Sequence, residues 1–260
     1  MRWHDGAVWF VDMHEGTVHR VVPGEEVETI ARVHGFVSGI DWLADGTLLV
    51  VSMHDRRILR LVDGRLEVYA DLLTIADYHL NDLVVRDDIA YVGDFGYDSF
   101  VGAPSRQSGI LSVTPDGEAR AATPKFDFPN GMAITPDGGT LIVAESWGDQ
   151  ISAFDRADDG SLSGYRLWAE MPTNCIPDGL ALHADGTVWV AAPGDSAVYR
   201  VSGGEGPIEK LDFGERKPIA CAFGGEDGNT LLVASSVALL PHECREARSA
   251  SVEAITLNTD

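Results

Sequence analysis

A short polar turn followed by a run of strand-forming residues recurs six times along the chain. Each turn is Asp-Gly or a close variant of it, and each run is rich in Val, Leu, Ile and Trp. The six runs cover residues 7–11, 47–51, 89–92, 140–144, 187–190 and 230–233. Asp-Gly supplies the positive φ that a tight hairpin turn requires, and β-branched and aromatic residues favour strands. The pattern therefore predicts six β-hairpins at regular intervals.

The interval between the turns indicates the architecture. The turns end at positions 6, 46, 88, 138, 186 and 228, and the third copy, Arg86-Asp87-Asp88, lacks the glycine. Further strand-like segments follow several hairpins, as at residues 56–62 and 196–201. Six units of about four short strands predict an all-β chain that forms a single six-bladed β-propeller domain over residues 1–260. An open solenoid is the alternative, but it would need capping units, and none is recognisable.

One position of the repeat carries an oxygen-bearing side chain in three consecutive units. It lies seven or eight residues before the end of each turn, near the start of the predicted inner strand. In units two to six the residues at this position are Ser38, Asn81, Asn130, Asp178 and Ala220, and in unit one the position precedes Met1. Equivalent positions of a closed ring of repeats lie at one level. We therefore expect Asn81, Asn130 and Asp178 to meet near the central channel.

The chemistry of these three residues is that of a hard-cation site. Two carboxamides and one carboxylate offer only oxygen ligands, which favours Ca²⁺, Mg²⁺ or Mn²⁺ over zinc or copper. One carboxylate leaves most of the cation's charge uncompensated, so the cation would polarise a bound carbonyl and acidify bound water. The alternative is that Asn-Gly and Asp-Gly only form turns. The common phase of the three positions favours a shared site.

Charge and composition narrow the class of function. The chain has 41 acidic and 19 basic residues, and its formal charge of −22 argues against binding of nucleic acid or of anionic membranes. It contains no apolar run of 18 residues and begins without a secretory leader pattern. The three cysteines, Cys175, Cys221 and Cys244, form no CxxC pair. A disulfide framework and a zinc–thiolate site are therefore not expected, and the expected compartment is the cytoplasm.

Several motifs together carry a resemblance to a known family. They are Asn81-Asp82, Pro129-Asn130-Gly131-Met132-Ala133 with Pro136-Asp137-Gly138, Pro177-Asp178-Gly179-Leu180 with residues 184–190, and Arg2-Trp3-His4-Asp5-Gly6. In these motifs, which extend over essentially the whole chain, the sequence resembles the SMP-30/gluconolactonase/LRE family, the regucalcin-like lactonases. The resemblance implies a six-bladed propeller with one divalent cation, Ca²⁺, Mg²⁺, Mn²⁺ or Zn²⁺, in its channel. It also implies hydrolysis of a sugar lactone.

The resemblance further implies roles for individual residues. Asn130 and Asp178 would hold the metal, Asp178 would also act as the general base, and Asn81 would contact substrate or a metal-bound water. The family's third metal ligand is a Glu in a Glu-x-Pro motif whose Pro corresponds to Met1, so that Glu is not part of this chain. Some members carry an Arg two residues before the Asn, where this chain has His79. This difference argues against a preference for phosphorylated or highly polar sugars.

His79 and Asp98 are the further candidates for substrate contact. The imidazole of His79 has an unperturbed pKa near neutrality and could shuttle protons, and a structural role at the channel mouth is the alternative. Asp98, like Asp94, lies where members of the family contact substrate at the channel rim, and the alternative for both is a solvated loop acid. The segment Pro241-His242-Glu243-Cys244-Arg245 is expected to be a loop that lies beyond the channel.

Three functions remain open at this point. The leading hypothesis is a metal-dependent hydrolase of a lactone, with the cation as Lewis acid and Asp178 as ligand and general base. A non-catalytic propeller that binds a ligand or a protein is the second, because one carboxylate alone holds a cation weakly. Organophosphate hydrolysis on the same scaffold is the third. Residues 251–257 are expected to form a strand of the last unit, whose N-terminal partner strand would lie upstream of Met1.

Overall fold

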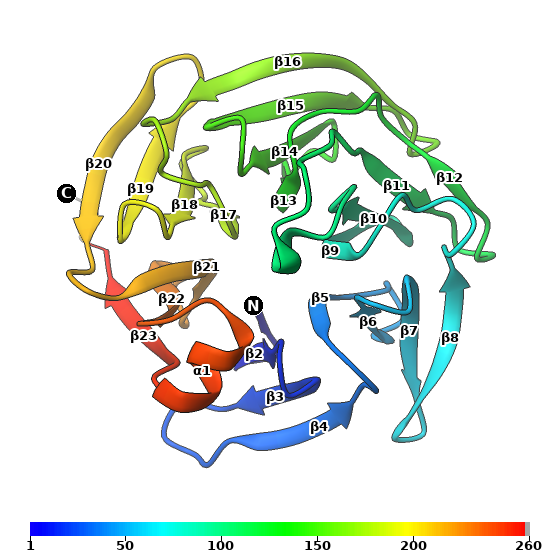
Figure 1. Ribbon diagram of the computed structural model, residues 1–260, viewed down its shortest axis with the longest axis horizontal. Helices are drawn as coiled ribbons and strands as arrows, with labels where there is room; N and C mark the ends of the chain where they lie inside the picture. Colours follow the sequence, from blue (N-terminus) through cyan, green and yellow to red (C-terminus); the bar gives the residue numbers. More distant parts are fainter. Residues whose placement is uncertain (258–260) are drawn as a thin grey trace.

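The computed structural model describes residues 1–257, apart from the side chain of Phe100. Its strands form six small antiparallel sheets arranged around one central axis, which Figure 1 views end-on. Strands that follow one another in sequence are neighbours within each sheet. The predicted six-bladed β-propeller is therefore confirmed, and the N-terminus lies inside the ring of blades.

Each blade starts with the strand nearest the axis and continues outwards. The first three blades are β1 (Arg2–His4), β2 (Ala7–Asp12), β3 (Thr17–Val21) and β4 (Glu28–Arg32); β5 (Val37–Trp42), β6 (Leu48–Ser52), β7 (Arg57–Val62) and β8 (Arg65–Asp71); and β9 (Leu80–Arg86), β10 (Ile89–Asp94), β11 (Ile110–Val113) and β12 (Ala119–Ala121). The last three are β13 (Pro129–Ile134), β14 (Thr140–Glu145), β15 (Gln150–Arg156) and β16 (Leu162–Glu170); β17 (Leu180–Leu182), β18 (Val188–Ala192), β19 (Ala197–Ser202) and β20 (Gly206–Asp212); and β21 (Lys217–Gly224), β22 (Thr230–Ser236) and β23 (Ser251–Thr256).

The second strands of the blades form the buried centre of the fold. Every residue of β6, β10 and β18 is buried. Runs of consecutive apolar residues suit this position, because neighbouring blades cover the strand on both faces. One apolar cluster, for example, joins Ile142 of β14 to Val190 of β18. The hydrophobic effect therefore acts mainly between blades, and it fixes the spacing of their inner strands.

A glycine at the inner end of the fourth blade lets two backbones meet near the axis. A Cβ atom on Gly131 would lie 2.5 Å from the carbonyl oxygen of Asp178 and 2.5 Å from the amide nitrogen of Leu180. A residue with a side chain could not occupy this position without moving one of the strands. The contact brings Asn130, which precedes the glycine, beside the segment that carries Asp178.

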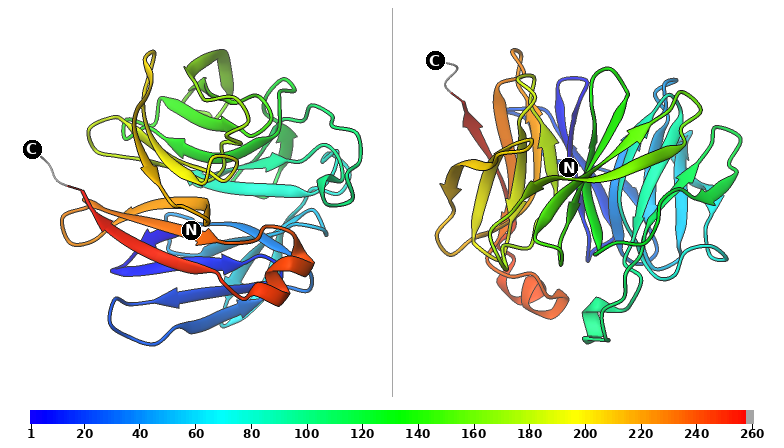
Figure 2. Two further views of the ribbon diagram at one scale, coloured as in Figure 1. Left: turned by 60° about the vertical axis from the view of Figure 1, so that its left-hand side comes forward. Right: turned by 90° about the horizontal axis from the view of Figure 1, so that it is seen from above.

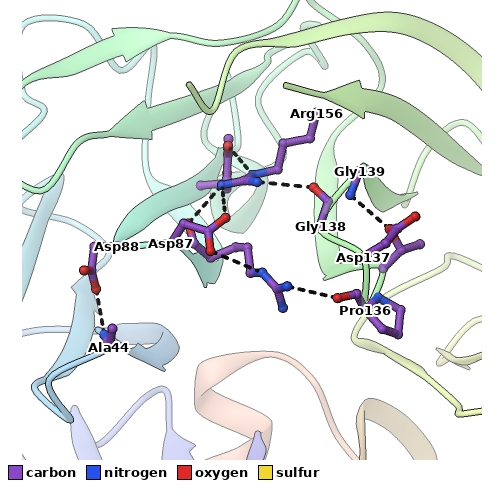
Figure 3. Close-up of polar contacts among 11 residues, drawn as sticks. Ala44, Asp87, Asp88, Pro136, Asp137, Gly138, Gly139 and Arg156 are labelled. Carbon is purple, nitrogen blue, oxygen red and sulfur yellow. Dashed lines mark hydrogen bonds and ion pairs between the residues drawn. The ribbon is translucent and has the colours of Figure 1, made fainter. Parts of the chain in front are cut away.

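The third hairpin turn has Asp88 where the other turns have glycine, and both of its aspartates contact other blades. Asp87 and Asp88 have φ values of 54° and 58°, in the left-handed region that a tight hairpin turn requires. Asp88 accepts a hydrogen bond from the N–H of Ala44 at 2.6 Å, and the Asp87 carboxylate lies 3.0 Å from Nη2 of Arg156 (Figure 3). This turn thus ties the third blade to the second and to the fourth.

Arg156 is the buried partner in this connection. Its side chain is 3% exposed, whereas that of Asp87 is 60% exposed. It donates hydrogen bonds to the hydroxyl of Tyr91 and to the carbonyl oxygens of Gly138 and Arg86. Because the guanidinium is always charged, these acceptors offset much of the cost of removing it from water.

The sixth sheet has three strands among the described residues, whereas each of the other five has four. A groove of about 430 Å³ lies between β20 and β23 and is lined by Phe213, Arg216 and Glu253, among others. This is where a fourth strand of the blade would lie. The expectation that such a strand comes from upstream of Met1 remains a prediction.

One segment differs from its expected structure. Residues 241–245 were expected to be a loop, but they belong to the short helix α1 (Pro241–Ala247). Proline suits the first position of a helix because it has no N–H to leave unsatisfied there. Figure 2 shows that α1 and the short 3₁₀ helix η1 (Ser99–Val101) project from the same face of the propeller. No helix in residues 1–257 is long and apolar enough to cross a membrane.

Candidate metal and substrate site

Asn81, Asn130 and Asp178 belong to the inner ends of three neighbouring blades. Asn81 is the second residue of β9, Asn130 is the second residue of β13, and Asp178 comes two residues before β17. The backbone at these positions is held by the second strand of the same blade. The amide of Asp178, for example, donates to the carbonyl oxygen of Ala191 in β18 at 2.8 Å.

Side-chain hydrogen bonds join the three positions across the blade boundaries. The Nδ2 atom of Asn81 donates to the carbonyl oxygen of Pro129 at 3.0 Å. The Nδ2 atom of Asn130 donates to Oγ of Ser146 at 3.0 Å, and that hydroxyl donates to the carbonyl oxygen of Pro177 at 2.7 Å. Each connection ends on the residue immediately before the next predicted position. The three side chains therefore occupy equivalent places in consecutive blades, as the phase of the repeat predicted.

These hydrogen bonds also orient the two carboxamides. Each Asn uses its NH₂ group as a donor to a neighbouring oxygen atom. The Oδ1 atoms of Asn81 and Asn130 accept no hydrogen bond from the described part of the chain. Asn81 is only 5% exposed, so its orientation is fixed by its surroundings. Carbonyl oxygens held in this way are suitable ligands for a hard cation.

Asp178 is a partly buried carboxylic acid with an altered acidity. Loss of hydration raises its pKa to about 7, and the negative charge of Asp82 adds to this effect. The nearby N–H of Gly179 and the NH₂ group of Asn130 favour the ionised form and act in the opposite direction. Desolvation of an anion is costly unless a cation is nearby. The donor set and this elevated pKa both fit a site for a divalent cation, which would favour the ionised carboxylate.

Asp82, next to Asn81 in sequence, makes different contacts. Its carboxylate lies 3.6 Å from Nη2 of Arg2, whose Nε is 4.0 Å from the carboxylate of Asp41. Arg2 also donates a hydrogen bond to the carbonyl oxygen of Leu83. An arginine thus stands between two carboxylates contributed by β5 and β9. Asp82 contributes to the electrostatic field at Asp178, but its own carboxylate is committed to the arginine.

His79 directly precedes β9, the first strand of the third blade, and its ring lies among other aromatic rings. Its ring centroid is 4.3 Å from that of His54 and 4.1 Å from that of Tyr78. Burial lowers the pKa of His79 to about 4, and the neighbouring imidazole of His54 adds to the effect. The ring is therefore neutral at physiological pH. It can donate or accept a hydrogen bond or stack on a ligand, but it cannot act as a proton shuttle near pH 7.

The carboxylates of Asp94 and Asp98 both accept hydrogen bonds from Tyr78, next to His79. For Asp94, the structure differs from one of the two interpretations, a solvated loop acid. The residue is 2% exposed and accepts hydrogen bonds from the N–H groups of Tyr78 at 3.0 Å and Gly96 at 2.7 Å. Burial raises the pKa of Asp94. Asp98 is partly buried and accepts a hydrogen bond from the hydroxyl of Tyr78 at 2.7 Å. Both carboxylates therefore fix the loops that hold His79, and contact of Asp98 with a substrate remains a prediction.

Ser146 is the residue of this site that the sequence did not reveal. It follows β14, is 2% exposed, and connects Asn130 to the segment before Asp178. The backbone around it is strained, since Phe128 and Ile176 both have positive φ values, 58° and 56°. Both stand directly before a proline and two residues before a predicted ligand. A positive φ at bulky or β-branched residues is rare, and such strain is common at functional sites.

The other positions of the same phase contribute little ligand chemistry. Ser38 donates its hydroxyl to the carbonyl oxygen of Asn81 at 2.8 Å, and Ala220 has no polar group. The position predicted for the first blade lies before residue 1. Within residues 1–257, no three or more His, Cys, Asp or Glu side chains converge as they would in a typical metal site. A cation bound here would therefore depend on the carboxamide oxygens.

Comparison with known proteins supports the same architecture and identifies a protein family. A family model described as "SMP-30/Gluconolactonase/LRE-like region" matches residues 1–237. Pentonolactonase XacC of Haloferax volcanii is 26% identical over 242 residues, which cover 90% of this chain and 79% of that protein. Regucalcin of Gallus gallus is 28% identical over 137 residues, but that match covers 50% of this chain and only 45% of the relative.

A solved structure gives the same result for the fold. Regucalcin from Agrobacterium tumefaciens strain C58, described as a calcium-binding protein, superposes with a TM-score of 0.81. The match covers 96% of this chain and 86% of that chain at 19% sequence identity. At this identity the likeness establishes the shared propeller and nothing finer.

Proposed function

This chain belongs to the SMP-30/Gluconolactonase/LRE-like family, and from that membership together with the site we propose that it is a divalent-metal-dependent hydrolase that opens a lactone ring. The observation that carries the proposal is the alignment of Asn81, Asn130 and Asp178 in consecutive blades, with the NH₂ groups of the two asparagines used as donors. A relative named as a pentonolactonase, matched over 90% of this chain, supports the substrate class.

The residues present suggest a division of labour. Asn130 and Asp178 would hold the cation through oxygen atoms, and Asn81 would orient the substrate or the attacking water. A divalent cation bound there would supply Lewis-acid polarisation of the ester carbonyl and make water more acidic. Asp178 would accept the proton of the attacking water, because a bound cation would keep its carboxylate ionised. Ser146 holds the carboxamide of Asn130 in its orientation.

A metal-dependence assay tests the proposal. The protein is stripped with a chelator and supplied separately with Ca²⁺, Mg²⁺, Mn²⁺ or Zn²⁺, and ring opening of D-ribono-1,4-lactone and γ-phenyl-γ-butyrolactone is followed by acid release. We expect activity that requires metal and that falls at least about a hundredfold in Asp178→Ala. The matched control is Asp158→Asn, an exposed loop aspartate remote from the site, which should retain full activity. Full metal-dependent turnover by Asp178→Ala would refute the proposed role.

A non-catalytic ligand-binding propeller is the second candidate. It is favoured by the presence of only one carboxylate among the three residues of the site. Calorimetric titration with each cation separates the two functions. Stoichiometric binding that Asp178→Ala abolishes supports the hydrolase, whereas an absence of binding together with an absence of turnover supports the scaffold. Organophosphate hydrolysis is tested in the metal-dependence assay by supplying a phosphotriester in place of the lactone.

A further inference from the structure

A continuous row of rings borders the candidate site along the second, third and fourth blades. We call it the aromatic arc, and its members are Phe36, His54, His79, Phe95, Phe128 and Trp147. The centroid distances between successive members are 4.4, 4.3, 6.3, 4.6 and 5.5 Å. Rings at such separations contact one another through stacked or edge-on geometries. The arc is therefore one connected surface and not a set of separate side chains.

Two members of the arc stand shortly before residues of the candidate site in the sequence. His79 stands two residues before Asn81, and Phe128 stands two residues before Asn130. Phe36 holds the equivalent place before Ser38, at the same phase of the second blade. A ligand whose carbonyl group reached the Asn and Asp oxygens would therefore have rings along one side.

Part of the arc is buried support and part is available for contact. Phe95 and Phe128 are 5% and 6% exposed and pack with Met53 and Tyr97 in one apolar cluster. Trp147, in contrast, is 47% exposed. His54 is also exposed, and Phe36 and His79 are partly exposed. Large aromatic rings on a rigid foundation, left open at one edge, are typical of a ligand-binding surface.

The chemistry of the arc favours an uncharged ligand. The members of the arc present ring faces, and none of them carries a guanidinium or ammonium group. The nearby Arg56 donates its Nη1 atom to the carbonyl oxygen of Ala76 at 3.3 Å. The net charge of −22 also disfavours anionic substrates. Ring faces, in contrast, gain most from stacking with another flat, apolar ring.

We propose that the substrate is a lactone with an uncharged aromatic substituent, which stacks on the exposed rings of the aromatic arc while the ester carbonyl reaches Asn81, Asn130 and Asp178. Trp147 is the principal specificity-determining residue, because it is the most accessible large ring of the arc. This inference rests on the proposed lactonase function for the reaction itself. Recognition of the aromatic ring by the arc is independent of that reaction.

Two lactones with the same ring size test the inference. γ-Phenyl-γ-butyrolactone and D-ribono-1,4-lactone differ in whether the substituents are aromatic or hydroxylated. We expect the wild type to show kcat/KM at least about tenfold higher for the phenyl lactone. Trp147→Ala should raise KM for the phenyl lactone roughly three- to tenfold and leave the kinetics of the hydroxylated lactone unchanged, and Trp147→Phe should keep most of the affinity.

The control variant is Leu167→Ala, which truncates an equally exposed apolar side chain on the outer strand β16. It should leave both substrates unaffected. A wild-type preference for the hydroxylated lactone would overturn the inference. Equal loss on both substrates in Trp147→Ala would do the same, because it would indicate a general structural role for the ring.

A binding experiment separates this inference from the proposed reaction. The lactam 5-phenyl-2-pyrrolidinone cannot be hydrolysed under these conditions, and its binding is measured by calorimetry on the wild type, Trp147→Ala and Leu167→Ala. If neither lactone is turned over with any cation, the proposed function is refuted. Binding of the lactam then tests on its own whether the aromatic arc recognises an aromatic ligand. Saturable binding that is weakened only in Trp147→Ala supports the aromatic site. Absence of saturable binding, or equal binding by all three proteins, refutes it.

Discussion

The Nδ2 atom of Asn130 lies 3.0 Å from Oγ of Ser146, to which it donates a hydrogen bond. Ser146 in turn donates to the carbonyl oxygen of Pro177, directly before Asp178. One hydroxyl group thus controls the orientation of one predicted ligand and the placement of the segment that carries the other. Groups that orient ligands in this way usually affect metal affinity without contacting the metal.

Ser146→Ala should therefore weaken cation binding. We expect the dissociation constant for the preferred divalent cation to rise roughly tenfold to a hundredfold, because the carboxamide of Asn130 would lose its fixed orientation. Calorimetric titration of the chelator-stripped protein measures this directly. The carbonyl oxygen of Pro177 would also lose its donor, at a cost of about 1–3 kcal/mol in the free energy of unfolding.

Ser152→Ala is the matched control for this variant. Ser152 is also a buried serine of the fourth blade, but its hydroxyl donates to the carboxylate of Glu145 and not to the site. It should reduce the free energy of unfolding to a similar extent and leave the affinity for the cation unchanged. If both variants lost affinity equally, the role assigned to Ser146 would be wrong.

The stability of the metal-free protein should depend on pH through Asp178. Its pKa in the folded protein is about 7, above the ordinary value of 3.8, so between these values the folded state binds more protons than the unfolded state. The free energy of unfolding must then fall as the pH rises from about 4 to 7 and level off above that range. Allowing for the partial exposure of the carboxylate, we expect this contribution to be on the order of 1–2 kcal/mol.

Urea unfolding at pH 5 and at pH 8 measures this effect, with Asp178→Asn as the reference that cannot titrate. The wild type should lose more stability than the variant between the two pH values. Addition of the bound cation at pH 8 should restore stability to the wild type only, because the cation favours the ionised carboxylate. An identical pH dependence in the two proteins would contradict the elevated pKa of Asp178.

His79 should not control the pH dependence of turnover. Its pKa of about 4 lies below the range in which the enzyme would be assayed, so the imidazole stays neutral from pH 5.5 to pH 8. His79→Phe preserves a ring next to His54, and we expect the acid limb of the kcat/KM profile to keep its position within about 0.3 pH unit. Disappearance of that limb in His79→Phe would assign the ionisation to His79 instead of Asp178.

The parts of the fold and site that the sequence predicted are those that depend on a repeated local pattern. Asp-Gly turns and apolar runs have a direct conformational cause, so the six blades followed from spacing, as did the places of Asn81, Asn130 and Asp178 at the inner ends of neighbouring blades. Ser146 was missed because one of its hydrogen bonds crosses to the fifth blade and neither bond has a sequence signature. Asp94 was misjudged because its backbone donors come from two loops whose folding brings them to one carboxylate.

The third turn also shows that contacts between blades cannot be recognised from the local sequence. The sequence showed only that Arg86-Asp87-Asp88 departs from Asp-Gly, which looks like decay of the repeat. The structure shows that the two aspartates reach the neighbouring blades through Ala44 and Arg156. Glycine at position 88 would suit the turn conformation better but could not accept the hydrogen bond from Ala44. At this turn, a residue that is less favourable for the left-handed backbone conformation provides a contact with a neighbouring blade.

Arg156→Ala should accordingly destabilise the propeller without affecting the site. Arg156 is almost fully buried, and its removal would leave the hydroxyl of Tyr91 and the carbonyl oxygens of Gly138 and Arg86 without their donor. We expect a loss of about 3–5 kcal/mol in the free energy of unfolding, because each buried acceptor left without a donor costs about 1–3 kcal/mol. Asp87→Asn should cost less than about 1 kcal/mol, because that carboxylate is mostly exposed and asparagine tolerates the positive φ.

Urea unfolding gives both values, and calorimetry on the folded variants should show unchanged cation affinity. Equal losses of stability in the two variants would mean that the ion pair itself, and not the buried hydrogen bonds of Arg156, holds the third and fourth blades together.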